Sequence, residues 1–158
     1  MSDRPAPPRP MARRGDRVHS AGKSCLPTAP SMPTLSTYIV EDSPVIRENL
    51  IATLEELVPV RVVGTAEDEY TAVQWLQQPG HHADLVIVDI FLKSGSGLGV
   101  LRAAQALPQA RRMVVLSNYA TPDMRRKCLE LGADRVFDKS ADIDALILYC
   151  GSLAAAET

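Results

Sequence analysis

Five residues with reactive side chains each follow a short apolar run of the sequence. They are two adjacent acids, a third acid, a hydroxyl residue and a lysine, namely Glu41, Asp42, Asp89, Ser117 and Lys139. Asp89 follows residues 85–88, four apolar side chains in a row, which is typical of a strand buried on both faces of a parallel sheet. In open α/β sheets the reactive groups lie just beyond the carboxyl ends of the strands. We therefore expect these five side chains to converge on one edge of a sheet.

Three carboxylates at one sheet edge need a cation among them. Glu41, Asp42 and Asp89 would repel one another by about 4 kcal/mol for each close pair at an effective dielectric constant of about 20. Oxygen donors without a thiolate or an imidazole favour a hard ion, and Mg²⁺ fits because it takes few protein ligands and keeps waters for a phosphate. We expect the three acids to bind Mg²⁺ directly or through water, with the backbone carbonyl of Phe91 as a further ligand.

A lysine and a hydroxyl beside such a metal site indicate phosphoryl transfer. Lys139 supplies a second positive charge, and together with Ser117 it can neutralise the oxygens of a transferring phosphoryl group. Asp89 then acts as the nucleophile and forms an acyl phosphate. Each residue alone has an ordinary explanation, because acids are favoured at helix N-termini and a single lysine is usually exposed. Their combination favours the metal site.

Predicted strands and helices alternate after residue 34. Apolar runs predict strands at residues 36–40, 60–65, 85–88, 113–116 and 135–137. Amphipathic stretches predict helices at residues 44–58, 69–78, 98–107, 121–131 and 141–153. This order implies right-handed βαβ crossovers and a parallel sheet with helices on both faces. The predicted fold is therefore α/β, a flavodoxin-like (βα)5 doubly wound parallel sheet of five strands.

The first predicted helix has a distinct start and one apolar face. Ser43 is a suitable N-cap, and the proline that follows it fits the first turn. Four apolar residues recur at intervals of four, four and three, so we expect all of them to face the core: Ile46, Leu50, Leu54 and Leu57.

The composition is that of a soluble globular protein with a basic N-terminal segment. Of the 158 residues, 46% are hydrophobic and 23% charged, and no apolar run approaches the ~20 residues of a membrane span. Residues 1–34 carry six basic residues, two acidic ones and seven of the 12 prolines, without periodicity, so we predict a disordered tail. The tail lacks an aromatic residue to stack on bases, so we expect no direct binding to nucleic acid, and none to a membrane. Three scattered cysteines favour a reducing compartment, the cytoplasm.

The residues that follow the predicted strands resemble those of receiver domains of two-component response regulators. The shared pattern is an acidic pair after the first strand, an acceptor aspartate after the third, a hydroxyl after the fourth and a lysine after the fifth. It stands here as Ile39-Val40-Glu41-Asp42, Val88-Asp89, Leu116-Ser117 and Asp138-Lys139, with the family's loop glycine at Gly97. The resemblance covers residues 35–155.

This resemblance implies a phosphorylation-controlled switch rather than an enzyme. In the family, the residue that corresponds to Asp89 accepts a phosphoryl group from a sensor histidine kinase or a phosphotransfer protein, with Mg²⁺ as the cofactor. The residues that match Ser117 and Lys139 contact the phosphate. The surface formed by the fourth helix, the fifth strand and the fifth helix then changes its protein partners, and a homodimer is compatible with this behaviour.

The sequence departs from the family pattern around Lys139. The next residue is Ser140 where many members have proline, and we expect it to cap the last helix. The family's switch aromatic falls on Val136, and Phe137 beside it is expected to point to the opposite face of its strand. Asn118 replaces the small residue that is usual after the hydroxyl, which narrows access to the phosphate.

Two aromatic residues are expected to slow the loss of the phosphoryl group. Phe91 and Tyr119 lie two positions beyond Asp89 and Ser117, where side chains flank the path of an attacking water. Bulky apolar groups at these positions predict a long-lived acyl phosphate.

Three functions fit these residues. We expect a single-domain response regulator that signals through protein contacts, because the sequence after the predicted domain is too short for an output domain. The first alternative is the truncated receiver of a longer DNA-binding regulator. The second is a metal-dependent phosphohydrolase with Asp89 as its nucleophile. That class usually has a second acid two residues after the nucleophile, and Phe91 at this position argues against it.

Overall fold

Strands and helices alternate along the part of the chain that the computed structural model describes, residues 34–108, 111–118 and 120–156. The strands are β1 (Leu35–Val40), β2 (Val60–Ala66), β3 (Leu85–Val88), β4 (Arg112–Ser117) and β5 (Arg135–Asp138). The helices are α1 (Pro44–Leu57), α2 (Glu69–Gln77), α3 (Gly97–Gln105), α4 (Pro122–Glu130) and α5 (Ile143–Ala156). The predicted tail, apart from residue 34, and the predicted role of Tyr119 fall outside the described residues.

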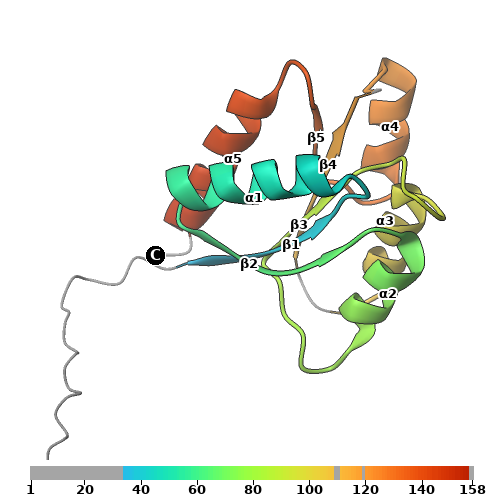
Figure 1. Ribbon diagram of the computed structural model, residues 1–158. Helices are drawn as coiled ribbons and strands as arrows, with labels where there is room; N and C mark the ends of the chain where they lie inside the picture. Colours follow the sequence, from blue (N-terminus) through green and yellow to red (C-terminus); the bar gives the residue numbers. More distant parts are fainter. Residues whose placement is uncertain (1–33, 109–110, 119, 157–158) are drawn as a thin grey trace, which may run out of the picture. The chain divides into compact units, whose positions relative to one another are not determined.

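The five described strands form one parallel sheet in the order β2-β1-β3-β4-β5. This order and the alternating helices confirm the predicted flavodoxin-like fold (Figure 1). The register brings the carboxyl ends of the strands together. Val40 pairs with Val88, Val88 pairs with Val115, and Ser117 pairs with Asp138. The residues that follow β1, β3 and β5 therefore lie at the same edge of the sheet.

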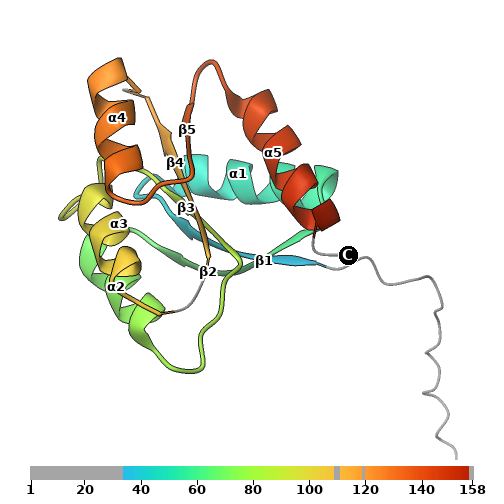
Figure 2. The same ribbon diagram turned by 180° about the vertical axis from the view of Figure 1, so that it is seen from behind.

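Helices cover both faces of the sheet, α1 and α5 on one and α2, α3 and α4 on the other (Figures 1 and 2). Side chains of β1 alternate between two apolar cores, so that Tyr38 packs with α2 and α3 residues while Ile39 packs with α1 and α5 residues. All four residues of β3 are buried. This double-sided burial explains why the third strand appears in the sequence as a continuous apolar run.

Polar side chains fix where four of the described helices begin. Ser43, Asp68, Ser96 and Thr121 each accept a hydrogen bond from a backbone N–H in the first turn of the helix that follows. The predicted cap of the last helix is wrong. Helix α5 begins at Ile143, and the hydroxyl of Ser140 instead donates to the carboxylate of Asp138, 2.5 Å away. The first hydrogen bond of the helix runs from the N–H of Leu146 to the carbonyl of Asp142 at 2.9 Å, so Asp142 rather than Ser140 takes the capping position.

Only the middle of the predicted apolar face of α1 is buried. Leu50 and Leu54 are 7% and 0% exposed, whereas Ile46 and Leu57 near the two ends are 37% and 59% exposed. The helical period identified the stripe that faces the sheet, but it carries no information on how far the neighbouring elements extend along that stripe. None of the helices in the described ranges is long and apolar enough to span a bilayer.

Two aspartates align the strands at the opposite, amino edge of the sheet. The carboxylate of Asp84, before β3, accepts hydrogen bonds from the backbone N–H and the hydroxyl of Ser36 in β1, at 3.1 and 3.0 Å. Asp134, before β5, accepts from the backbone N–H of Met113 in β4 at 2.8 Å. Burial alone would raise the pKa of Asp84, but hydrogen bonds from His82 and Ser36 outweigh it and lower the pKa below its usual value.

Replacing Asp84 by alanine is expected to destabilise the sheet. The change leaves the N–H and hydroxyl of Ser36 without their acceptor, so we expect the free energy of unfolding to fall by about 1–3 kcal/mol. Urea titrations at neutral pH measure this loss. Because the folded state lowers the pKa of Asp84, its contribution is present above the pKa of the unfolded chain, about 3.9, and disappears as the pH falls through the folded value. The difference between wild type and Asp84→Ala therefore shrinks in acid.

The matched control for this experiment is Glu56→Ala on the exposed side of α1, which is expected to change the unfolding free energy by about 0.5 kcal/mol or less. Equal stability of Asp84→Ala and Glu56→Ala at neutral pH would contradict the proposed alignment.

Candidate functional site

The predicted acids meet at the carboxyl edge of the sheet. Because Val40 and Val88 are paired, Glu41 and Asp89 follow their strands side by side. One carboxylate oxygen from each of Glu41, Asp42 and Asp89 lies within 4.8 Å of the others. Glu41 and Asp89 are 2% and 6% exposed, whereas Asp42 is half-buried. The sequence prediction that these acids cluster is thus matched by the geometry.

Lys139 reaches the same edge from the end of β5. Its Nζ lies 2.6 Å from Oε1 of Glu41 and 2.9 Å from Oδ2 of Asp89, and the side chain is 10% exposed. The backbone N–H of Lys139 donates to the carbonyl of Ser117 at 3.0 Å, which fixes the lysine to the end of β4. A buried ammonium group therefore bridges the acids that follow β1 and β3.

Burial and charge act together on these groups. Burial raises the pKa of Glu41, and repulsion from Asp89 adds to this effect, against the lowering that hydrogen bonds from Lys139 and Ser43 produce. Burial alone would lower the pKa of Lys139, but its hydrogen bonds and charge interactions with Asp89 and Glu41 raise it above the ordinary value. The lysine consequently stays charged in this edge cluster.

The chemistry of the donors fits a divalent cation. Three carboxylates against one ammonium leave a net charge of about −2 when all are ionised. All of the acidic donors are oxygens, as Mg²⁺ prefers. The chain bends around Asp89, whose Oδ1 is 3.4 Å from the backbone N of Phe91. The segment that carries the Phe91 carbonyl is therefore next to the acids.

A small pocket opens onto this cluster. It has a volume of about 190 Å³, and Asn118, Phe91 and Lys139 are among its lining residues. Ser117 is fully buried at the end of β4, so Asn118 rather than Ser117 lines the pocket from that strand. The Phe91 side chain is 52% exposed at the pocket.

The sequence analysis did not predict the role of Arg47, which holds the backbone at Glu41 in place. Its guanidinium donates to the backbone carbonyl of Glu41 at 2.9 Å and lies 3.4 Å from the carboxylate of Glu67. The residue sits on α1 in a stretch of mixed polar and apolar residues, and its type and position indicate only a solvated helix face. The contact between Arg47 and Glu41 could not be predicted because nothing in the sequence of either segment indicates that α1 passes over the end of β1.

Comparison with known proteins identifies the family. A family model for the response regulator receiver domain matches residues 37–150 of this chain. The chain belongs to that family. Among solved structures similar to this receiver domain is a LuxR-family two-component response regulator from Aurantimonas sp., with a TM-score of 0.70 and 24% identity over 78% of this chain and 86% of that chain. Another is the phosphorylated cyanobacterial phytochrome response regulator RcpA, with a TM-score of 0.62 and 25% identity over 76% and 91% of the two chains.

The curated relatives are longer than this receiver domain. The transcriptional regulatory protein MalR of Bacillus subtilis is 29% identical over 99 residues, which cover 63% of this chain and 41% of MalR. The chain spans about half the length of the curated relatives it matches, with 47%, 41% and 53% for three of them.

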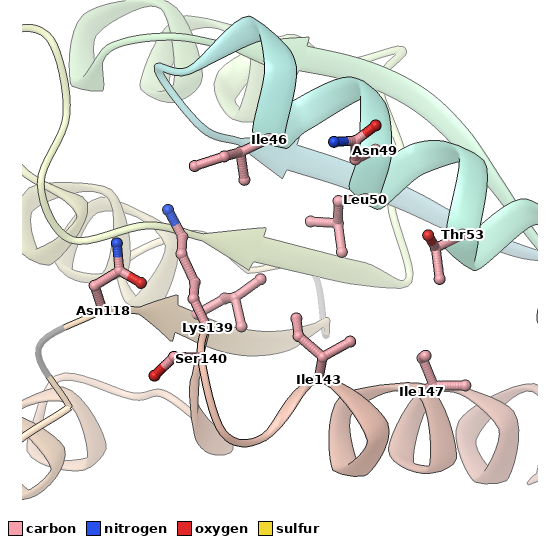
Figure 3. Close-up of a pocket in the computed structure, with 10 residues that line it drawn as sticks. Ile46, Asn49, Leu50, Thr53, Asn118, Lys139, Ser140, Ile143 and Ile147 are labelled. Carbon is pink, nitrogen blue, oxygen red and sulfur yellow. The ribbon is translucent and has the colours of Figure 1, made fainter.

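A larger groove lies beside the acidic cluster of the receiver domain. It has a volume of about 440 Å³ and runs between α1 and α5. Figure 3 shows Ile46 and Leu50 on α1 facing Ile143 and Ile147 on α5, with Lys139 at one end. The partly exposed Ile46 thus belongs to an apolar surface that adjoins the reactive side chains.

Gly97, the loop glycine of the family pattern, packs directly on the acceptor strand. A Cβ atom here would lie 2.2 Å from the backbone oxygen of Asp89 and 2.8 Å from a methyl group of Val88. The backbone N–H of Gly97 also donates to the carbonyl of Ile90 at 2.9 Å. Helix α3 can therefore approach the end of β3 only if its first residue has no side chain.

Gly97→Ala is expected to destabilise the domain by about 1–3 kcal/mol, because the helix must shift away from Asp89 to make room for the methyl group. Urea unfolding at neutral pH measures this loss. Gly80→Ala is the matched control, because a Cβ atom at Gly80 meets nothing within 4 Å. A similar loss in both variants would show that the contact with Asp89 is not the cause.

Proposed function

We propose that this receiver domain accepts a phosphoryl group on Asp89 from a sensor histidine kinase or a phosphotransfer protein, with Mg²⁺ as the cofactor. The observation that carries the proposal is the position of the Asp89 carboxylate, buried between the Lys139 ammonium and the acids Glu41 and Asp42. Lys139 already pairs with both Glu41 and Asp89, so a structural ion pair alone would not account for the third carboxylate, that of Asp42, beside them.

Each residue of the cluster has a separate proposed role. Glu41, Asp42 and Asp89, with the backbone carbonyl of Phe91, would hold the ion. Bound Mg²⁺ would neutralise phosphate oxygens and orient the phosphoryl group. Lys139 would stabilise negative charge on the same oxygens, as its position 2.9 Å from Asp89 allows. The hydroxyl of Ser117 is proposed as a further donor to the phosphate.

The proposed reaction is an in-line displacement at phosphorus. The Asp89 carboxylate forms a P–O bond while the P–N bond of a phosphohistidine breaks, and the electron pair returns to the imidazole. The partly exposed apolar groove between α1 and α5 adjoins the nucleophile, and the exposed side chain of Val45 extends the apolar surface of α1. We propose that the phosphodonor protein binds along this side of the pocket.

The response is proposed to pass through β5 to the surface formed by α4, β5 and α5. Lys139 stands at the end of β5, so a new bond to phosphate would act on this strand. Arg125 of α4 donates to the carbonyl of Val136 at 3.0 Å and to Asp142 before α5 at 3.3 Å, and so connects all three elements. Phe137 is buried against α1 and α5, which leaves the small Val136 on the other face, as predicted. The switch would therefore act through backbone contacts rather than an aromatic rotamer.

The receiver part of a longer DNA-binding regulator is a second candidate. The match to less than half of MalR, a transcriptional regulatory protein, favours it. Both candidates share the chemistry at Asp89 and differ in whether the output is a partner protein or an attached domain.

Incubation with acetyl phosphate and Mg²⁺ tests the proposed chemistry. Wild type is expected to gain one phosphoryl group by mass spectrometry, stable in acid and labile in base, and to gain none after chelation of the metal. Asp89→Asn should gain none, while the control Asp144→Asn, at an exposed position on α5, should behave as wild type. Repeated release of inorganic phosphate, many times per protein, would instead favour the phosphohydrolase. An unmodified Asp89 would refute the acceptor role.

Loss of the phosphoryl group is expected to be slow because Phe91 shields it. The side chain lines the pocket beside Asp89 and offers no hydrogen bond to an attacking water. Phe91→Asn should therefore release phosphate from the phosphorylated domain faster, by roughly 10-fold if its amide makes one hydrogen bond of about 1.4 kcal/mol that orients the attacking water. The rate is followed by mass spectrometry after removal of the phosphodonor. Leu129→Asn, which also replaces an exposed apolar side chain, serves as the control. Equal rates in the three proteins would exclude the shielding role.

A further inference from the structure

Glu69, the first residue of α2, is bound to the loop that follows β3. Its carboxylate accepts a hydrogen bond from the backbone N–H of Ser96 at 2.9 Å. Its own backbone N–H donates to the carbonyl of Ser94 at 3.0 Å. An acid at this position is favoured by the helix dipole alone, but these two bonds join it to another part of the chain.

Two glycines of the loop region leave space for the Glu69 side chain. A Cβ atom at Gly99 would lie 2.2 Å from Oε2 of Glu69, and one at Gly95 would lie 2.5 Å from its Cβ. Gly95 also has a φ of +80°, which disfavours any other residue there. The glutamate therefore fills a site that is shaped for it at the start of α3.

The same loop carries the backbone carbonyl of Phe91, the proposed fourth ligand of the ion. Ser96, whose backbone N–H donates to the carboxylate of Glu69, pairs with Phe91 in an isolated antiparallel bridge. Ser96 also caps α3 by accepting from the N–H of Leu98 at 3.0 Å. A continuous set of contacts thus leads from Glu69 through Ser96 to Phe91, beside Asp89.

We infer that Glu69 is a positioning residue for the metal site: it holds the loop from Phe91 to Gly99 in the arrangement that keeps Phe91 beside Asp89, so that its carbonyl can serve as the proposed ligand. This inference rests on the proposed function. A loop that is fixed before the ion arrives loses less conformational freedom on binding, so its ligand contributes more to affinity. The contacts of Glu69 described above are all with the loop, so it would act on the site through Ser96 and Phe91.

Binding of Mn²⁺, measured by electron paramagnetic resonance of the free ion, tests the role of Glu69 without any phosphoryl transfer. Glu69→Ala is expected to weaken Mn²⁺ binding by about 10-fold, the lower end of the range for residues that orient metal ligands. Glu69→Gln should restore most of the affinity, because its amide oxygen can still accept from Ser96. Urea unfolding in the absence of metal shows whether stability changes in parallel.

The contact with Gly99 provides a second, independent test. Gly99→Ala should weaken Mn²⁺ binding in the wild-type background, because its methyl group collides with the carboxylate of Glu69 and displaces the loop. In the Glu69→Ala background the same change meets no carboxylate, so it should have no further effect on affinity. Alanine otherwise suits this helical position. Equal effects of Gly99→Ala in both backgrounds would overturn the inference.

The failures of the two proposals can be told apart. Suppose that wild type binds Mn²⁺, that Asp42→Asn does not bind it, and that Glu69→Ala binds it as tightly as wild type. The metal site then stands and the positioning role of Glu69 is refuted. If Glu69→Ala lowers only the stability and Glu69→Gln does not restore it, Glu69 is merely structural. If wild type binds no Mn²⁺, the proposed function and this inference both fall.

Discussion

The buried ammonium of Lys139 between two carboxylates is the interaction on which the rest of this receiver domain depends. Glu41 and Asp89 follow neighbouring strands and are almost fully buried, so without a cation their mutual repulsion would oppose the parallel pairing of β1 and β3. The lysine satisfies both acids only because β5 ends at the same edge of the sheet. The cluster keeps a net negative charge, which fits the divalent cation proposed above. The fold and the chemistry are thus two consequences of one arrangement.

Much of this arrangement can be predicted from the sequence because it depends on the order of residues within single strands and helices. The continuous apolar run of β3 reports burial on both faces, and the alternation of strands and helices fixes a parallel sheet. In a parallel sheet, the residue after each strand must lie at the same edge, so the positions of Glu41, Asp89 and Lys139 follow from strand ends alone. Helix starts such as Ser43 are also local, because the cap and its donor are three residues apart.

The features that could not be predicted depend on contacts between distant segments. The exposure of Ile46 depends on how α1 and α5 diverge, which the period of one helix does not contain. The predicted start of α5 is wrong because the hydroxyl of Ser140 binds the carboxylate of Asp138 and not a backbone N–H of the helix. The sequence around Ser140 is compatible with either bond. Glu69 resembles any acid in the first turn of a helix. Its contact with Ser96, 27 residues away, has no signature in either segment.

Two arginines hold the frame around the lysine and leave the lysine as the charge that can respond. Arg47 donates to the backbone carbonyl of Glu41, directly after β1, and Arg125 donates to that of Val136 within β5, so each joins a strand to a neighbouring helix. Both arginines also pair with carboxylates outside the cluster, Glu67 and Asp142, so none of these partners changes its charge when Asp89 does. Lys139, by contrast, pairs through its ammonium with the carboxylates of Glu41 and Asp89, so the proposed phosphorylation of Asp89 would change the position that the lysine prefers. If Asp89 is phosphorylated as proposed, this fixed frame around the lysine would direct the effect of the new charge to a single strand, β5.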